Sequence, residues 1–381
     1  MIRLLTGLII LVAFYGCLPQ PSEITGEFAG VGSDVEQVIK LSLKDAPPIE
    51  TFSQRIIGDA ELPIFFGRLT QIEPLEEGGF FIFDAAQFHI LYFNGNGNFV
   101  ESFGREGEGP GEFSQAVTLK TFDEKLYVLD RLAYKIDVFT QSDGNWQFEY
   151  SYPIENINDD RPDTFVKVDE ESFWIRYRHT RTHIGKSYSV SHLVRIFKDS
   201  STPPQTWIVE YPPINLFFED LGGFWASYPG PFTPLPVVAI TSDSDIITAR
   251  TDEYRFLRSN DAGNELHVSE MEVDSLTLTE EQKQNVSGFA ERIMDMVQEN
   301  MPESRPPVYN RLLPDNNNGF WAGYFDETQN EQVWMLIGET GTTETTINLD
   351  PNISIINYNN RAFYGFITNE EGLQEIVVIE I

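Results

Sequence analysis

The chain has little cysteine, histidine and positive charge. Its 381 residues include one Cys, five His and 26 Lys plus Arg, against 59 Asp plus Glu. A single Cys excludes an intramolecular disulfide. The formal charge of −33 at pH 7 repels nucleic acid and anionic lipid, so we expect neither as a partner. The same charge suits general solubility, an extracytoplasmic protein, or a host that lives in high salt.

The first 17 residues have the pattern of a targeting segment. Arg3 supplies a positive start, and residues 4–14 are apolar but too short for the ~20 helical residues that span a bilayer. The segment ends in Gly16 and Cys17, and a Cys after a small residue at this place resembles the lipobox of bacterial lipoproteins. The resemblance implies cleavage before Cys17 and lipidation of its thiol. The alternative is an ordinary signal peptide with an incidental Cys.

Residues 18–36 are polar, contain Pro and Gly, and predict a flexible tether with a reach on the order of 25 Å. Leu18 follows Cys17, where an Asp would favour inner-membrane retention in some bacteria. We therefore expect an outer-membrane lipoprotein, and the leaflet that faces the domain stays open. No stretch after Cys17 resembles a transmembrane helix, so the lipid would be the only membrane contact. Residues 37–381 are expected to form one folded domain and a monomer.

Residues 80–93 and 126–139 repeat one another at an offset of 46. Each copy reads as a strand, a turn that begins with Asp84 or Asp130, a second strand, and then a turn that contains Gly. A period in the forties made of short strands is typical of a β-propeller blade. Weaker copies continue to the end of the chain. Six strand onsets match, at Phe80, Leu126, Phe173, Ile246, Phe320 and Ala362.

The sequence thus predicts an all-β, six-bladed β-propeller. The two widest gaps between strand onsets, from Phe173 to Ile246 and from Ile246 to Phe320, are expected to contain insertions. The first, residues 200–236, is rich in Pro and aromatics and predicts the outer strand of blade three followed by a long loop. The second has a capping box at residues 279–282 and an apolar stripe, which predict a helix over about 279–300 packed on the propeller. A strand-like run at residues 38–43 is expected to pair into the last blade and close the ring.

The link between the first two blades, residues 103–113, is rich in Gly and contains Gly109-Pro110-Gly111 shortly before Phe113. It resembles the signature of NHL repeats. Gly supplies positive φ and Pro110 stiffens the turn, whereas phosphate binding is not expected because no helix and no Lys-Ser/Thr pair follow. The chain as a whole resembles the NHL-like six-bladed β-propeller lipoproteins of Bacteroidetes and their relatives. This resemblance implies fold and location more than an activity.

Residues 176–183 have the least ordinary composition. The segment contains Tyr177 and five basic or titratable residues, Arg176, Arg178, His179, Arg181 and His183. One hypothesis is a pocket for an anionic or glycan ligand, in which the arginines bind carboxylate or sulfate and Tyr177 stacks. The alternative is that the arginines neutralise Asp and Glu around them. Two His four residues apart converge on a metal only in a helix, and this segment reads as strand or loop, so we expect no metal.

Asp84 and Asp130 begin matching turns, and we interpret them as bonding to turn backbone rather than as catalytic or metal-binding groups. No nucleophile-elbow motif is found. The ligand patterns of two families of propeller enzymes, gluconolactonase/regucalcin and streptogramin lyase, cannot be mapped onto the chain residue by residue. We therefore favour a lipid-anchored, non-catalytic binding or scaffolding module for a protein, peptide or glycan, without a cofactor. The alternative is a metal-dependent hydrolase or lyase with its site at the central channel.

Overall fold

The computed structural model describes most of the chain from Gln37 onward. The described residues are 37–42, 46–58, 62, 65–156, 160–169, 172–183, 186–197, 205–214, 216–220, 225–229, 236–251, 253–260, 264–271, 311–326 and 331–381. Within these ranges the regular structure is entirely strand, and no helix there is long and apolar enough to cross a bilayer. The helix predicted over about 279–300, and the targeting and tether segments, lie outside the described residues.

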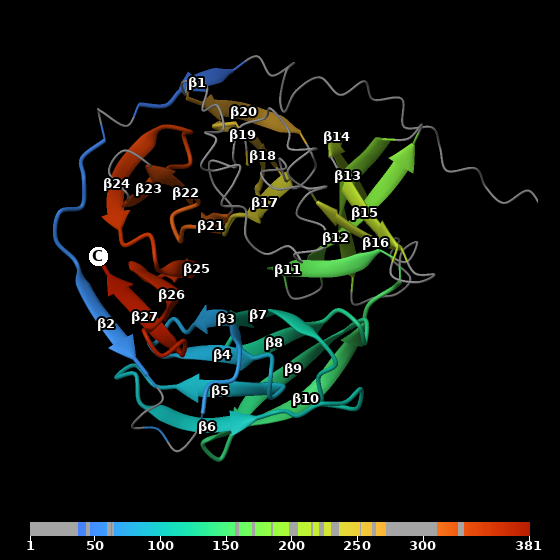
Figure 1. Cartoon of the computed structure of the whole chain (residues 1–381), viewed down its shortest axis with the longest axis vertical. Helices are drawn as coiled ribbons and strands as arrows, with labels where there is room; N and C mark the ends of the chain where they lie inside the picture. Colours follow the sequence, from blue (N-terminus) through green and yellow to red (C-terminus); the bar gives the residue numbers. More distant parts are fainter. Residues whose placement is uncertain are drawn as a thin grey trace, which may run out of the picture.

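Six sheets stand around a central axis, so the chain is a six-bladed β-propeller, as its repeat predicts (Figure 1). Blade one consists of β3 (Leu69–Pro74), β4 (Phe80–Asp84), β5 (His89–Phe93) and β6 (Phe99–Phe103). Blade two consists of β7 (Ala116–Phe122), β8 (Lys125–Asp130), β9 (Lys135–Ser142) and β10 (Asn145–Pro153). Blade three consists of β11 (Arg161–Asp169), β12 (Ser172–His183), β13 (Lys186–Phe197) and β14 (Gln205–Ile214).

The second half of the ring repeats this plan. Blade four consists of β17 (Pro236–Ile240), β18 (Ile246–Arg250), β19 (Arg255–Ser259) and β20 (Glu265–Glu270). Blade five consists of β21 (Leu312–Pro314), β22 (Phe320–Asp326), β23 (Glu331–Ile337) and β24 (Thr343–Leu349). Blade six consists of β25 (Ser354–Asn359), β26 (Ala362–Thr368) and β27 (Gln374–Glu380), with a fourth strand from the N-terminal segment.

The first strand of each blade is the innermost one (Figure 1). Around the centre, β3 lies beside β7 and β25, β7 beside β11, and β21 beside β17 and β25. Each of the six predicted onsets falls at or next to the start of a blade's second strand, in β4, β8, β12, β18, β22 and β26. The prediction of six blades from these onsets is therefore confirmed.

The core is divided among the junctions between blades. In the described residues each pair of neighbouring blades encloses its own apolar cluster, and aromatic rings fill the one between blades one and two. There the ring of Phe81 meets Trp146 edge to face at 4.8 Å between centroids, and Phe83 meets Phe113 at 5.8 Å. Since every blade packs only on its neighbours, the described residues form a ring of this size without a single central core.

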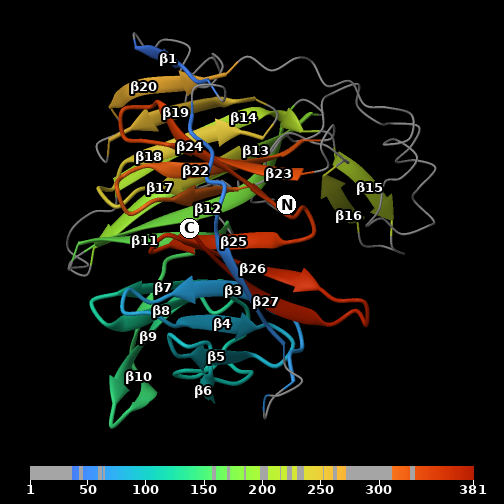
Figure 2. The same cartoon turned by 90° about the vertical axis from the view of Figure 1, so that its left-hand side faces the viewer.

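Residues 37–42 and 46–57, which we call the N-terminal strap, run along the outer edges of three consecutive blades (Figures 1 and 2). β1 (Val38–Lys40) pairs in parallel with β20 of blade four, and Pro48 forms a parallel bridge with Thr346 of blade five. β2 (Ser53–Ile57) then pairs antiparallel with β27 and completes blade six. The expectation that residues 38–43 join the last blade is therefore wrong. The N-terminal segment does close the ring, but it does so through β2, the more polar strand that follows β1 in the sequence.

The first long spacing contains more structure than expected. β14 covers the predicted outer strand of blade three. After it, β15 (Leu216–Asp220) and β16 (Trp225–Pro229) pair as a separate two-stranded sheet where a loop was expected.

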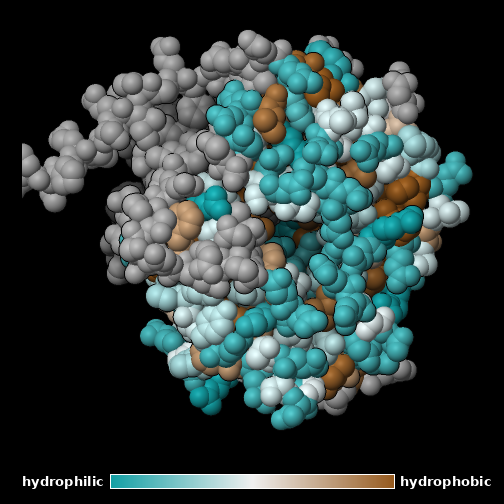
Figure 3. Space-filling view, turned by 180° about the vertical axis from the view of Figure 1, so that it is seen from behind, coloured by the Kyte–Doolittle hydropathy of each residue, from teal (hydrophilic) through white to brown (hydrophobic). Residues whose placement is uncertain are grey.

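Strand direction divides the connections between two faces of the ring. The links between blades and the turns between second and third strands lie on one side, which we call the link face. The turns between first and second strands, and between third and fourth, lie on the opposite side, the turn face. Seen from behind Figure 1, the molecule is largely hydrophilic around a recess near its middle (Figure 3).

Candidate functional site

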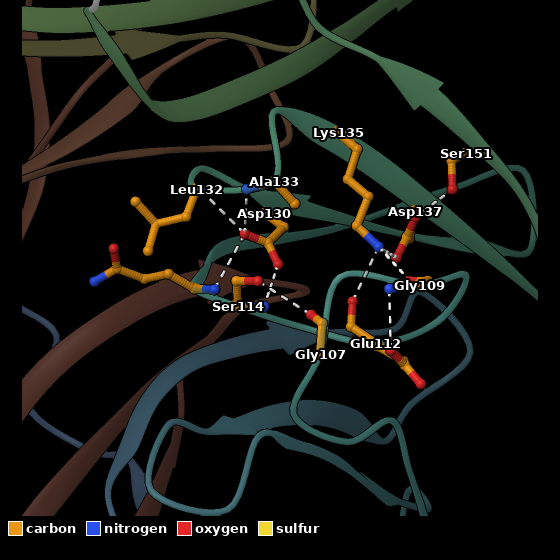
Figure 4. A network of polar contacts seen from close by, with 11 residues as sticks. Gly107, Gly109, Glu112, Ser114, Asp130, Leu132, Ala133, Lys135, Asp137 and Ser151 are labelled. Atoms are coloured by element: carbon orange, nitrogen blue, oxygen red, sulfur yellow. Dashed lines mark hydrogen bonds and ion pairs between the residues drawn. The ribbon is translucent and has the colours of Figure 1, made fainter.

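Asp84 and Asp130 each hold a blade-to-blade link against the following turn on the link face. Both carboxylates are fully buried. The donors to Asp84, at 2.6–3.3 Å, are the backbone N–H groups of Gly67, Arg68, Ala86 and Gln87. The donors to Asp130, at 2.5–3.1 Å, are those of Ser114, Gln115, Leu132 and Ala133 (Figure 4). The interpretation of these residues as turn-holding groups is confirmed, and a carboxylate with this many donors has no free edge for a metal or substrate.

The Gly-rich link is fastened by a buried lysine. The Lys135 ammonium donates to the carbonyl oxygens of Gly109 at 2.7 Å and Glu112 at 3.0 Å, and to the Asp137 carboxylate at 2.8 Å (Figure 4). Inside the link, the Gly109 N–H donates to the Glu112 carboxylate at 3.0 Å, and the Gly107 N–H donates to the Phe113 carbonyl at 3.1 Å. The link's amides are thus directed at the link itself, which is the geometry of a turn rather than of an anion cradle.

Blade three departs from this plan. The position equivalent to Asp84 and Asp130 is Tyr177, since all three pair with the inner strand just before a bulge. Its side chain is fully buried between blades two and three, and its hydroxyl donates to the Glu155 carbonyl at 3.0 Å. Burial raises the pKa of the Tyr177 phenol. A ring in this position cannot stack on a ligand, so the structure does not support the stacking role expected of Tyr177.

The strands of blade three also extend beyond those of its neighbours. β12 and β13 have twelve residues each and stay paired up to His183 and Lys186, so they form a long hairpin on the link face. His179, Arg181 and His183 belong to this hairpin, and their side chains lie outside the described structure. In a strand, residues four apart are separated by about 13 Å, so the two histidines do not converge on one ion through their spacing.

Arg176 and Arg178 surround the carboxylate of Asp163. Asp163 is the extra residue of a β-bulge in β11, between Pro162 and Thr164. The Arg176 guanidinium donates to both of its oxygens, Nε to Oδ1 at 2.7 Å and Nη2 to Oδ2 at 3.0 Å. Arg178 pairs with Oδ2 as well, while 45% of its side chain remains exposed. Arg176 therefore has the neutralising role that was the alternative for this segment, and Arg178 has capacity for a further partner.

Two arginines that were not singled out in the sequence join this group. Arg161 lies directly opposite Arg178 in the register of β11 and β12. Arg131 follows Asp130 as Arg178 follows Tyr177, and its Nε donates to the Gln115 amide oxygen at 2.7 Å. Burial lowers the pKa of Arg131, the positive charges of Arg161 and Arg178 also lower it, and Asp163 opposes them. We call Arg131, Arg161 and Arg178 the arginine rim.

A second polar group lies at the inner strands of three blades. The buried Glu73 carboxylate accepts hydrogen bonds from Lys120 Nζ at 3.2 Å, from the Thr121 N–H at 2.9 Å, and from the Asn357 amide at 2.8 Å. These contacts tie blades one, two and six together at the centre. In the described ranges no group of three or more His, Cys, Asp or Glu side chains is arranged to hold a metal ion, and Cys17 lies outside those ranges.

Comparison with known proteins agrees with the fold. A family model, DUF5128, described as a 6-bladed beta-propeller, matches residues 64–198. A member of the duf4221 family from Bacteroides vulgatus is 10% identical, with 87% of this chain and 97% of that one covered and a TM-score of 0.51. No curated protein matches the chain.

Two further solved structures are more distant. A catalytically inactive virginiamycin B lyase from Staphylococcus aureus, solved with quinupristin, is 11% identical, with 87% of this chain and 100% of that one covered and a TM-score of 0.45. A protein of unknown function from Bacteroides caccae is 10% identical, with 74% and 81% covered and a TM-score of 0.39. At these identities the likenesses concern the fold alone and carry no activity to this chain.

Proposed function

We propose that this propeller is a non-catalytic binding or scaffolding module that holds a protein, peptide or glycan at the bacterial cell envelope. The observation that carries the proposal is the hairpin of blade three, whose two twelve-residue strands are the longest in the described part of the chain. Blades one and two close the link face with buried aspartate clamps, whereas blade three replaces the clamp by Tyr177 and extends a long hairpin there. A rigid ring that presents one long hairpin is typical of recognition by loops on a fixed scaffold.

The proposed location agrees with the course of the strap. In this proposal the chain is an NHL-like lipoprotein, acylated at Cys17, tethered by residues 18–36 to the outer membrane, and monomeric. β1 runs parallel to β20, which runs from the turn face towards the link face, so Gln37 lies on the side of the turn face. The tether would therefore join the ring on the side opposite the blade-three hairpin, and leave the link face accessible to a ligand.

The test uses residues 18–381 as bait in envelope extracts of the host. In a matched variant, residues 179–190 are replaced by Asn-Gly, because Arg178 pairs with Ser191 and a two-residue turn can close the shortened hairpin. We expect the intact chain to capture a specific component that the variant does not. The variant should still unfold cooperatively, at a somewhat lower temperature because residues 210–214 of β14 lose their partner. Equal capture by both chains, or none by either, would refute a binding function at this hairpin.

The alternative, a metal-dependent hydrolase or lyase with its site at the channel, is supported by no specific contact in the described residues. The buried carboxylate of Glu73, beside the inner strands, already accepts bonds from Lys120, Thr121 and Asn357. Metal analysis of the gently purified chain tests the alternative directly. A stoichiometric divalent metal that is lost on mutation of channel residues would favour the enzyme over the binding module.

A further inference from the structure

The arginine rim concentrates positive charge in a chain whose formal charge is −33. Arg161 and Arg178 face each other across two paired strands, an arrangement that destabilises a sheet when the charges are alike. Arg131 lies close enough for its pKa to be lowered by both of them. In the described part of the chain no carboxylate forms an ion pair with Arg131 or Arg161, and Asp163 is already occupied by Arg176 and Arg178. An anion placed between these guanidinium groups would relieve the repulsion.

The rest of the molecule limits what kind of anion this is. The overall negative field opposes the approach of a long polyanion, such as a polyuronate, over its whole length. A single charge carried on a neutral body feels mainly the rim, because at physiological salt charges beyond about 8 Å are screened. Guanidinium groups bind carboxylate in a planar, bidentate manner, which gives geometric selectivity as well as energy. The observations therefore favour one compact carboxylate.

An exposed apolar side chain lies next to the rim. Leu132 is 47% exposed in the turn that also holds Arg131, and its backbone is fixed by the buried Asp130 (Figure 4). A carboxylate with an apolar group beside it matches this pair of features. The last residue of a peptide has this chemistry, with its terminal carboxylate one bond from the carbon that bears its side chain.

We propose that the arginine rim, together with Leu132, binds the C-terminal carboxylate and the last apolar side chain of a peptide. The proposal rests on the binding function given above and names the ligand chemistry of the link face. Arg131, Arg161 and Arg178 contact the carboxylate, and Arg176 keeps Asp163 in place beneath them. The assignment differs from the expectation drawn from residues 176–183, since Arg131 and Arg161 enter the site and Tyr177 leaves it.

The experiment measures binding of a small probe, N-acetyl-Ala-Leu with a free carboxylate, to residues 18–381 by saturation-transfer NMR titration. Its C-terminal amide and galacturonic acid serve as comparison probes. Two variants remove rim charges, Arg161→Gln alone and together with Arg131→Gln. Arg68→Gln is the matched control, because Arg68 is an exposed arginine that enters blade one as Arg161 enters blade three.

We expect the free dipeptide to bind, the amide to bind at least about tenfold more weakly, and the Arg161→Gln chain to lose affinity for the acid by a similar factor. Arg68→Gln should leave the affinity unchanged. Equal binding of acid and amide, or full affinity in the double variant, would overturn the proposal. Binding of galacturonic acid without binding of the dipeptide would overturn the peptide assignment. If the hairpin variant loses its envelope partner but the dipeptide does not bind, the binding function stands and this ligand assignment fails.

Discussion

The Thr118 hydroxyl donates a hydrogen bond of 3.0 Å to the carbonyl oxygen of Asp163, and so joins the inner strand of blade two to that of blade three. The same kind of bond recurs around the ring. Arg311 Nη1 donates to the Ile356 carbonyl at 2.8 Å, and the Asn357 amide donates to the Ile72 carbonyl at 3.0 Å. Asp163 and Ile356 are both bulge residues, whose carbonyls are turned out of their own ladders. At two of these three junctions, therefore, a bulge supplies the acceptor that joins neighbouring blades.

Thr118→Val should destabilise the ring by about 1–3 kcal/mol. Valine keeps the shape of the side chain but removes the donor, and the Asp163 carbonyl is left without this partner. Urea unfolding followed by tryptophan fluorescence measures the loss. Thr368→Val is the control, because Thr368 is exposed at the end of β26 and should change stability by no more than about 0.5 kcal/mol. Equal effects of the two substitutions would show that the inter-blade bond contributes nothing.

Asp130→Ala should cost more than about 3 kcal/mol, because four backbone N–H groups lose their acceptor in a buried place. Asp130→Asn should cost less, since the amide retains one acceptor oxygen. Thermal and urea unfolding of both variants give the order. Asp243→Ala, in an exposed turn, is the control and should be near neutral. A near-neutral Asp130→Ala would mean that the link and the turn are held by other contacts.

The sequence predicted most of the ring because the repeat is local. Asp84 and Asp130, 46 residues apart, identify one structural position, and the same spacing logic also relates Arg131 to Arg178 and Asp130 to Tyr177. Aligning Tyr177 with Asp84 and Asp130 would have placed Tyr177 in the core. The next aligned position would have placed Arg131 beside Arg178, at the site. Arg161 could not be found in this way, because its position opposite Arg178 depends on the register that the bulge at Asp163 imposes.

The strands with which the strap pairs could also not be predicted from the local sequence. β2 carries polar residues and has no strand pattern of its own, and its partner β27 is more than 300 residues away. Choice of partner at a sheet edge depends on which edge the chain reaches, and the sequence does not encode that path locally. The apolar run at residues 38–43 was therefore assigned to the wrong blade, although closure by the N-terminal segment was expected.

Truncating the strap in two steps should distinguish the contributions of β1 and β2 to the stability of the ring. Removal of residues up to 42 exposes the outer edge of β20 and should lower the melting temperature by a few degrees. Removal of residues up to 58 also exposes the edge of β27 and should lower the melting temperature by roughly 10 °C or more and promote aggregation. Calorimetry with light scattering, each chain compared with residues 18–381, makes the test. Equal melting of the three chains would contradict closure through β2.

The contact between the strap and blade four should weaken in acid. A hydrogen bond from Lys40 Nζ, at 2.7 Å, is the largest cause that lowers the pKa of Glu270, and Arg255 adds to it. A carboxyl whose pKa is lowered on folding stabilises the folded state above its unfolded value, about 4.5, and this contribution is lost as the pH falls through the folded value. Glu270→Gln should therefore melt about 1–2 °C lower than the natural chain at pH 7, and the gap should close below pH 4. A gap that stays constant from pH 7 to pH 3 would exclude this charge effect.

Arg258 joins blades four and five, and its loss should be among the most harmful single changes. The side chain is 2% exposed, and its Nε pairs with the Asp245 carboxylate at 2.7 Å. Its other nitrogens donate to the carbonyl oxygens of Asn318 at 2.8 Å and Glu339 at 3.3 Å. Arg258→Met keeps the apolar stem but leaves a carboxylate and two carbonyls without their donor, so we expect a loss of about 3–5 kcal/mol.

A titration distinguishes this loss of charge from a general loosening. Burial lowers the pKa of His267, and the positive charge of Arg258 lowers it further, whereas Asp245 raises it. In Arg258→Met the second of these causes disappears and Asp245 acts unopposed, so the pKa of His267 should rise. Histidine ring resonances followed by NMR against pH report the change, and Arg68→Met, at an exposed arginine, should leave both stability and this pKa unchanged. A destabilised variant with an unshifted His267 would mean that Arg258 acts through packing and hydrogen bonds rather than through its charge.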